Sequence, residues 1–381
     1  MVVNQQLQKN SCETFTIWGL MGLSVLGATY ISKLLPVSET GLLEVIFLLS
    51  SVITFFCNGV NKGILIVSVL SLLYLVYSFF SVLLITHANL IDFTQAYKSF
   101  YYFFLLAFFY NKKIFREASI IKLFNFLMAI FLFKYSADRF LFGIDRPTVL
   151  IENNFELILL ILLYYFVNII KKEQSMLNTF LMLLICIISG SRSSLIALMV
   201  AIVFSLDRKI DFKKIIIITL LPLAVLGVFL VFQARLDASG GSSYEQIDRY
   251  RFFLEFVFST SHWPWWEFLT GSTAITPLSP LSCAHLSFYQ PLFSYSGDGR
   301  CYSVILHSFL LRVIYDHGVI GFAFLIACLV IFLNKFALKH KICIITILLA
   351  TAMSVSSLNN VYVTLALVFF IGAEKNYRMN T

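Results

Sequence analysis

The chain has 381 residues, of which 59% are apolar and 13% charged, and its mean hydropathy is +0.87. Soluble domains average about 45–50% apolar and about 25% charged residues. The composition therefore excludes a disordered chain, a coiled coil and a conventional soluble enzyme. The net charge of +8 does not indicate nucleic-acid binding, because no basic run is long enough to line a phosphate groove. We predict an all-α polytopic membrane protein.

Apolar runs recur along the whole chain, many of them close to the roughly 17–25 residues that a spanning helix needs. About twelve transmembrane helices are expected, at 15–31, 41–57, 63–85, 93–110, 120–133, 155–170, 176–188, 195–206, 215–232, 309–333, 342–355 and 361–371. The runs beside Arg192 are short, which is typical of broken helices that line a cavity. The predicted organisation is helices 1–9 in residues 1–232, one large outer loop in 233–306, and helices 10–12 in 307–381.

Basic residues predict the orientation, because cytoplasmic segments are enriched in Lys and Arg. With both termini cytoplasmic, the inner side holds 17 of the 28 basic residues, and 14 of these 17 are Lys. The remaining 11 are mostly Arg: Lys33, Lys98, Lys134, Arg139, Arg146, Arg192, Arg235, Arg249, Arg251, Arg300 and Arg312. Arg grips phosphate or carboxylate with a planar fork, so the outer face is expected to bind an anionic ligand. The alternative is that these Arg side chains pair with Asp and Glu in loops.

The first motif is Ser-Gly-Ser-Arg-Ser-Ser at 189–194, which is predicted to place Arg192 near the outer membrane surface at the start of a helix. A guanidinium at membrane depth costs about 2.5–3.5 kcal/mol, and free N–H groups at a helix start attract an anion. The alternative is that Arg192 extends to the lipid headgroups.

The second motif is Asp248-Arg249-Tyr250-Arg251, followed by an aromatic stretch at 252–258. We predict an amphipathic helix beside the bilayer, with Arg249 and Arg251 offering a second phosphate clamp. The alternative is pairing with Asp248 or Glu255.

The third motif begins at His307, where the outer loop returns to the membrane. A neutral imidazole there can act as a general base on a sugar hydroxyl, and nearby guanidinium groups favour the neutral form. The alternative is an interfacial His whose hydrogen bonds are satisfied.

Other residues of the outer loop are also candidates for a role. Trp263, Trp265 and Trp266 could stack on sugars, although aromatic rings at the headgroup level are the preferred interpretation. Cys283 and Cys301 are candidates for a disulfide if the loop is periplasmic, worth about 3 kcal/mol. No CxxC pair and no Asp-x-Asp pair occurs in the sequence, so no metal site is expected.

In this order, the motifs resemble the O-antigen polymerase and O-antigen ligase superfamily of bacterial inner-membrane glycosyltransferases. The resemblance covers residues 189–321 and rests on the 189–194 motif and on Arg249, Pro264, His307, Leu311, Asp316 and Gly318. Residues 145–147 and 152–154 also resemble segments of polymerases.

The resemblance implies a GT-C-like helical fold and an inverting, metal-independent glycosyl transfer without a cofactor. The reaction would take place on the periplasmic face of a Gram-negative inner membrane. Arg192 and either Arg249 or Arg251 would hold the diphosphate, and His307 would activate the acceptor hydroxyl. Expected partners are an undecaprenyl-diphosphate-linked oligosaccharide, membrane lipid and a chain-length regulator protein. O-antigen polymerase is favoured; the alternatives are O-antigen ligase acting on lipid A core and, in another class, a lipid-linked sugar transporter or flippase.

Overall fold

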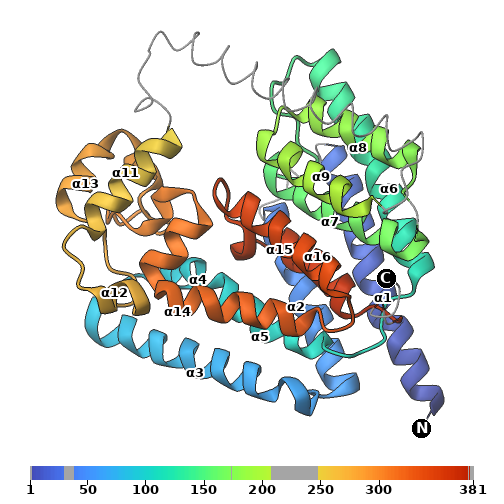
Figure 1. The fold of residues 1–381 in the computed structure, drawn as a ribbon, viewed down its shortest axis with the longest axis horizontal. Helices are drawn as coiled ribbons and strands as arrows, with labels where there is room; N and C mark the ends of the chain where they lie inside the picture. Colours follow the sequence, from blue (N-terminus) through green and yellow to red (C-terminus); the bar gives the residue numbers. More distant parts are fainter. Residues whose placement is uncertain (1, 30–37, 173, 207–247, 376, 378–381) are drawn as a thin grey trace.

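The computed structural model describes residues 2–29, 38–172, 174–206, 248–375 and 377. This part of the chain contains no strand, and its β-type contacts are two isolated bridges, Phe115–Ala373 and Phe336–Tyr377. The prediction of an all-α fold is confirmed (Figure 1). The α-helices are α1 (Val2–Ala28), α2 (Glu39–Asn58), α3 (Leu65–Ser81), α4 (Leu90–Ala96), α5 (Lys98–Leu106), α6 (Glu117–Ser136), α7 (Asn153–Lys171), α8 (Met176–Ser189), α9 (Arg192–Ser205), α11 (Asp248–Thr260), α12 (Trp265–Thr270), α13 (Pro280–His285), α14 (Phe309–Phe332), α15 (Leu338–Ala352) and α16 (Val361–Ile371).

Several helices are apolar enough to cross a membrane, in agreement with the predicted class of protein. Within the described ranges, 5 are long enough to do so: Glu39–Asn58, Lys62–Thr86, Glu117–Leu141, Asn153–Lys171 and Phe309–Phe332. The predicted number of about twelve spans is not confirmed. One reason is that apolar runs break: the run 93–110 divides into α4 and α5 at Tyr97, whose φ of −94° and ψ of 10° are not helical. The predicted span 215–232 lies outside the described residues.

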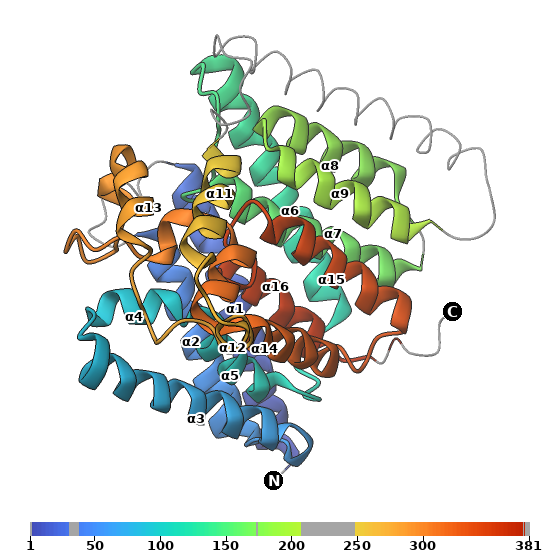
Figure 2. The ribbon, with the colours of Figure 1, turned by 60° about the vertical axis from the view of Figure 1, so that its left-hand side comes forward.

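The helices differ in how deeply they are buried, which hydropathy alone does not reveal. Every residue of α16 is buried, and α7 packs against α6, α9 and α16 near the centre of the bundle (Figure 2). In contrast, α3 lies along one edge of the molecule (Figure 1) and leaves Ile66 and Leu73 exposed. The most apolar interior thus surrounds α7 and α16, while the apolar outer face of α3 is available to lipid.

Lysines predicted to be cytoplasmic gather where α9, α14 and α16 end. The Lys335 Nζ donates to the carbonyl oxygens of Ile371 and Ala373 at 3.1 and 2.7 Å. The Lys339 Nζ donates to the carbonyl oxygen of Leu206 at 3.3 Å. Cations stabilise the free carbonyl groups at helix C-termini. The same three helices begin at the opposite end of the bundle, where the candidate site lies.

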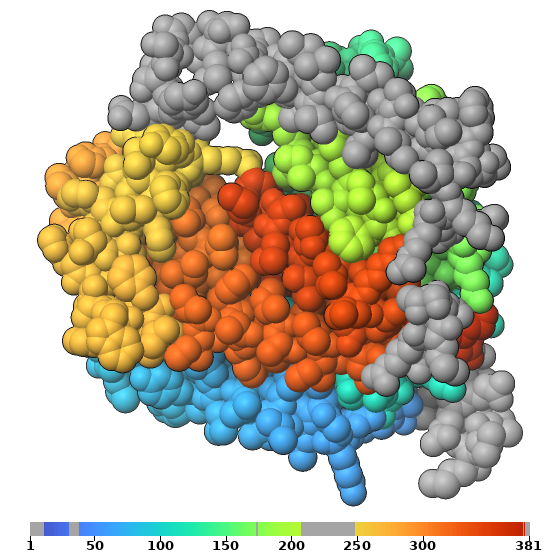
Figure 3. All heavy atoms as spheres, in the orientation of Figure 1, coloured from blue at the N-terminus to red at the C-terminus, as the bar shows by residue number. Residues whose placement is uncertain are grey.

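The described part of the predicted outer loop, residues 248–306, is folded rather than extended. It contains α11, α12 and α13, and a small apolar core that includes Phe252, Phe256, Leu278, Leu286 and Phe293. The predicted amphipathic helix is present as α11. Residues 233–247 of that loop lie outside the described residues. Figure 3 shows the yellow surface of residues 248–270 and the green surface of α8 and α9 on either side of the orange-red surface of α14 to α16.

Candidate active site

A cavity of about 660 Å³ lies at the end of the bundle where α2, α5, α7, α14 and α16 begin. We call it the arginine cavity, because its wall includes Arg146, Arg249 and Arg312, together with Lys98 and His307. Helix N-termini carry partial positive charge and free N–H groups. The wall also contains Glu44 and Glu152, so its four cationic side chains exceed its carboxylates by two. This excess and the helix N-termini both favour an anion in the cavity.

Local capping fixes where these helices begin. Ser38, Ser308 and Asn360 are the N-caps of α2, α14 and α16, and each side-chain oxygen accepts a hydrogen bond from a backbone N–H in the first turn of its helix. Such caps stabilise a helix by about 1 kcal/mol. The cap at Ser308 places Arg312 one turn into α14, at the wall of the cavity.

In the part of the chain that the structure describes, the three arginines of the cavity form no ion pair, although Glu152 lines the same wall and its charge acts on Arg249. Arg312 is nonetheless buried, at 5% exposed, and its guanidinium donates to the Ser356 hydroxyl at 3.3 Å. Burying a charge without a partner is costly, so Arg312 favours an anionic ligand in the cavity, and the exposed guanidinium groups of Arg146 and Arg249 can reach the same ligand.

Pairing within loops explains other arginines of the predicted outer face. Arg139 pairs with Asp145 at 2.7 Å, and Arg300 pairs with Asp298 at 3.9 Å. The alternative that outer-face arginines pair with Asp and Glu in loops therefore holds for Arg139 and Arg300. It does not hold for the three arginines of the cavity, which form no such ion pair among the described residues.

The carboxylates proposed as partners of Arg249 are engaged elsewhere. The Tyr289 hydroxyl donates to Asp248 at 2.5 Å, and Glu255 pairs with the His285 Nδ1 at 3.0 Å. Arg249 therefore faces the cavity without an ion pair to either of these carboxylates, although the charges of Asp248 and Glu152 still act on it.

Only one of the two arginines predicted at the start of α11 reaches the cavity. Arg249 lines it, whereas the Arg251 guanidinium donates to the backbone carbonyl oxygen of His285 at the end of α13. Residues two apart on a helix point to different faces. The structure therefore places Arg251 in the packing of the outer loop, away from the cavity.

His307 stands at the wall of the same cavity, just before α14. Its backbone is left-handed, with φ of +52°, and its ring lies 5.4 Å from that of Phe252. Phe252 is three residues after Arg249, so one face of α11 carries both. Burial lowers the pKa of the His307 imidazole, the charges of Arg312 and Arg249 lower it further, and Asp248 acts in the opposite direction. The neutral imidazole, which is the form able to accept a proton, thus persists to lower pH.

Arg192 is the first residue of α9, as predicted, with Ser191 as its N-cap. It does not line the arginine cavity, but its charge acts on a group that does. Burial is the largest cause that lowers the pKa of Arg249, and the positive charges of Arg192 and Arg146 lower it further. Asp248 and Glu152 act in the opposite direction. The guanidinium groups of Arg192, Arg146 and Arg249 therefore form one region of positive potential.

Two motifs that are separate in the sequence form one unit in the structure. The Asn153 side-chain amide donates to the backbone carbonyl oxygen of Ser189 at 3.0 Å, and the Ser191 hydroxyl donates to the Asn154 side-chain oxygen at 2.6 Å. Segment 152–154 is thereby joined to the 189–194 motif, which positions Arg192 beside the cavity.

Three cationic residues of the cavity are absent from the predicted site: Arg146, Arg312 and Lys98. Lys98 pairs with Glu44 at 2.6 Å, so it contributes less free charge than the arginines. The sequence alone could have indicated Arg312, because an ionisable residue within a membrane-spanning segment marks a functional site by default.

Cys283 and Cys301 are adjacent free thiols in the structure. A hydrogen bond between the two thiols is the largest cause that lowers the pKa of Cys283. Their disulfide stays a prediction. In the described ranges, no three His, Cys, Asp or Glu side chains gather closely enough to hold a metal ion.

The chain matches no protein-family model and no curated protein sequence. The functional interpretation therefore depends on the motifs and on the geometry of the cavity.

Proposed function

We propose that this protein is an O-antigen polymerase, which joins undecaprenyl-diphosphate-linked repeat units on the periplasmic face of a Gram-negative inner membrane. One observation carries the proposal: three arginines that form no ion pair within the described ranges, and an imidazole whose pKa is lowered, line a single cavity at the start of five helices. A diphosphate and a hydroxyl that must lose a proton are the two groups that this combination suits.

The reaction follows from the chemistry of these groups. The acceptor oxygen forms a bond to the anomeric carbon of the donor while the bond from that carbon to the diphosphate breaks, so the configuration inverts. His307 accepts the proton of the acceptor hydroxyl. Arg249, Arg146 and Arg312 bind the diphosphate and stabilise the negative charge that develops as it leaves. Fixed guanidinium groups can perform this task without a metal ion, and none is proposed.

A reconstituted reaction tests this proposal. Purified protein in detergent, given a synthetic undecaprenyl-diphosphate-linked repeat unit, should lengthen the glycan and should do so in the presence of EDTA. Lengthening in detergent separates an enzyme from a transporter or flippase, which needs a sealed vesicle to show its activity. Activity that appears only after magnesium is added would contradict the metal-independent reaction.

Deleting the gene distinguishes polymerase from ligase. A single repeat unit on the lipopolysaccharide core is expected for loss of a polymerase. Bare core with free lipid-linked polymer would instead identify a ligase. A chain-length regulator is the proposed protein partner, and its absence is expected to change the distribution of polymer lengths rather than the first linkage.

Membrane topology provides a further test. With both termini cytoplasmic, cysteines introduced at Arg192 and His307 should react with an impermeant thiol reagent from the periplasmic side, whereas one at Lys339 should not. Reaction of the first two from opposite sides would contradict the proposed site.

A further inference from the structure

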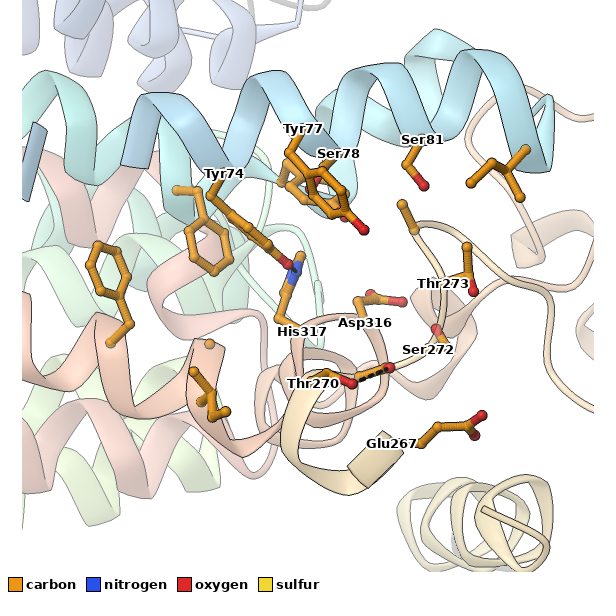
Figure 4. Close-up of a pocket in the computed structure, with 18 of the residues that line it drawn as sticks. Tyr74, Tyr77, Ser78, Ser81, Glu267, Thr270, Ser272, Thr273, Asp316 and His317 are labelled. Carbon is orange, nitrogen blue, oxygen red and sulfur yellow. Dashed lines mark hydrogen bonds between the residues drawn. The ribbon is translucent and has the colours of Figure 1, made fainter. Parts of the chain in front are cut away.

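A second cavity, of about 710 Å³, lies between α3 and the contact of α12 with α14 (Figure 4). We call it the tyrosine cavity. Figure 4 shows Tyr74, Tyr77 and Ser78 on α3 directed toward the opposite wall, where Asp316 and His317 lie on α14. No Lys or Arg is among its lining residues, so it differs in charge from the arginine cavity.

Two glycines build the wall opposite α3. Gly271 and Gly318 have positive φ values of +80° and +67°. A Cβ at Gly318 would lie 2.2 Å from the carbonyl oxygen of Leu269, and one at Gly271 would lie 2.6 Å from the backbone nitrogen of His317. Only glycine permits this conformation at such a close approach of two backbones. The helix α14 is interrupted at Gly318, immediately after Asp316 and His317, which line the cavity.

The polar groups of this wall are partly engaged. His317 is held by the Tyr74 hydroxyl at 2.9 Å from its Nδ1. Asp316 accepts a hydrogen bond from the Ser303 hydroxyl at 2.6 Å through one carboxylate oxygen, while its side chain extends toward the cavity (Figure 4). The Ser272 hydroxyl is buried and has no hydrogen-bond partner in the described part of the chain. Since the open cavity does not reach this oxygen, the hydroxyls of Tyr77 and Thr273 and the Asp316 carboxylate are the polar groups that a ligand meets.

The lining defines the chemical class of this ligand. Hydroxyl groups and a carboxylate hydrogen-bond to the hydroxyls of a sugar, and the aromatic rings of Tyr74, Phe100 and Trp266 offer apolar surface to the C–H faces of its ring. A phosphate would meet the Asp316 carboxylate in a lining that contains no Lys or Arg. A lipid chain would leave the second carboxylate oxygen of Asp316 without a hydrogen-bond donor.

We propose that the tyrosine cavity binds an uncharged saccharide. Arg312 lines the arginine cavity and Asp316 lines the tyrosine cavity, and these residues are one turn apart on α14. The two sites are therefore neighbours. If the proposed function holds, the saccharide is the glycan of a lipid-linked repeat unit, bound beside the diphosphate site. That identification rests on the proposed function, whereas binding of a saccharide does not.

Saturation-transfer NMR on the purified protein in nanodiscs tests the inference. The probes are the methyl glycosides of glucose, galactose, mannose and N-acetylglucosamine, each in millimolar excess. Wild-type protein should transfer saturation to at least one of them. Thr273 is exposed and lines the cavity, so Thr273→Trp should fill the site without disturbing the fold and should reduce the transfer at least tenfold.

Matched substitutions locate the binding. Tyr77→Phe removes one hydroxyl from the cavity and should weaken binding by about two- to tenfold. Tyr250→Phe removes a hydroxyl from an exposed position outside both cavities and should have no effect. Arg249→Ala should also leave saccharide binding unchanged.

Two results would overturn the inference. The first is that wild-type protein transfers saturation to none of the four glycosides. The second is that Thr273→Trp still transfers saturation although it is as well folded as the control variant Tyr250→Phe. The wild-type protein could bind a saccharide and lose this binding in Thr273→Trp, yet form no polymer in the reconstituted reaction. That combination would support this inference and contradict the proposed function.

Discussion

Arg249 and Arg251 provide a matched pair for testing the diphosphate site, because they lie two residues apart on α11 and only Arg249 lines the cavity. Arg249→Ala removes a charge-assisted hydrogen bond to the diphosphate, worth about 1.5–3 kcal/mol. At about 1.4 kcal/mol for each factor of ten, kcat/KM should fall about ten- to 150-fold. Arg251→Ala removes the hydrogen bond to His285 instead, so it should lower thermal stability and leave kcat/KM within about twofold.

The assay is the reconstituted reaction with a synthetic lipid-linked repeat unit, with initial rates measured at low donor concentration for both variants. Thermal unfolding in the same detergent establishes that each variant is folded. Equal losses of kcat/KM in the two variants would refute the assignment of Arg249 to the diphosphate, because packing of the outer loop would then account for both effects.

Two further predictions concern acid dependence and packing. Arg312→Gln removes a positive charge that lowers the pKa of His307, so the pKa of His307 should rise. The acidic limb of the profile of kcat/KM against pH should therefore move to higher pH. An acidic limb that does not move would exclude His307 as the base that the profile reports. Gly318→Ala should destabilise the protein by about 2–4 kcal/mol, from the left-handed backbone and from overlap with Leu269. Gly143→Ala, with φ of +66° and open space around the Cβ, should cost only about 1–2 kcal/mol, and equal losses of thermal stability in the two glycine variants would contradict the packing argument.

Hydropathy predicted most helices correctly, because long apolar runs form α-helices wherever backbone groups must be satisfied internally. It did not predict where runs break. The interruptions at Tyr97 and Gly318 arise from tertiary contacts: the Tyr97 ring packs against the His317 ring at 4.7 Å, and Gly318 lies against Leu269. Such contacts join segments more than 40 residues apart, and a single sequence carries no signal for them.

The sequence motifs predicted only part of the site, because the position of a side chain also depends on tertiary contacts. Arg249 and His307 belong to the cavity, but the choice between Arg249 and Arg251 depends on which face of α11 packs against the wall. That face is set by Phe252, which contacts His307. Arg146 lines the cavity together with Glu152 and Asn154, an arrangement that becomes visible only in three dimensions.

Retention of undecaprenyl diphosphate by the purified protein tests most directly whether the arginine cavity is a diphosphate site. Native mass spectrometry of wild-type protein released from nanodiscs should detect one bound molecule. The combined variant Arg146→Gln, Arg249→Gln and Arg312→Gln should lose it while keeping the thermal stability of a folded protein. Equal retention by the folded variant would contradict the account.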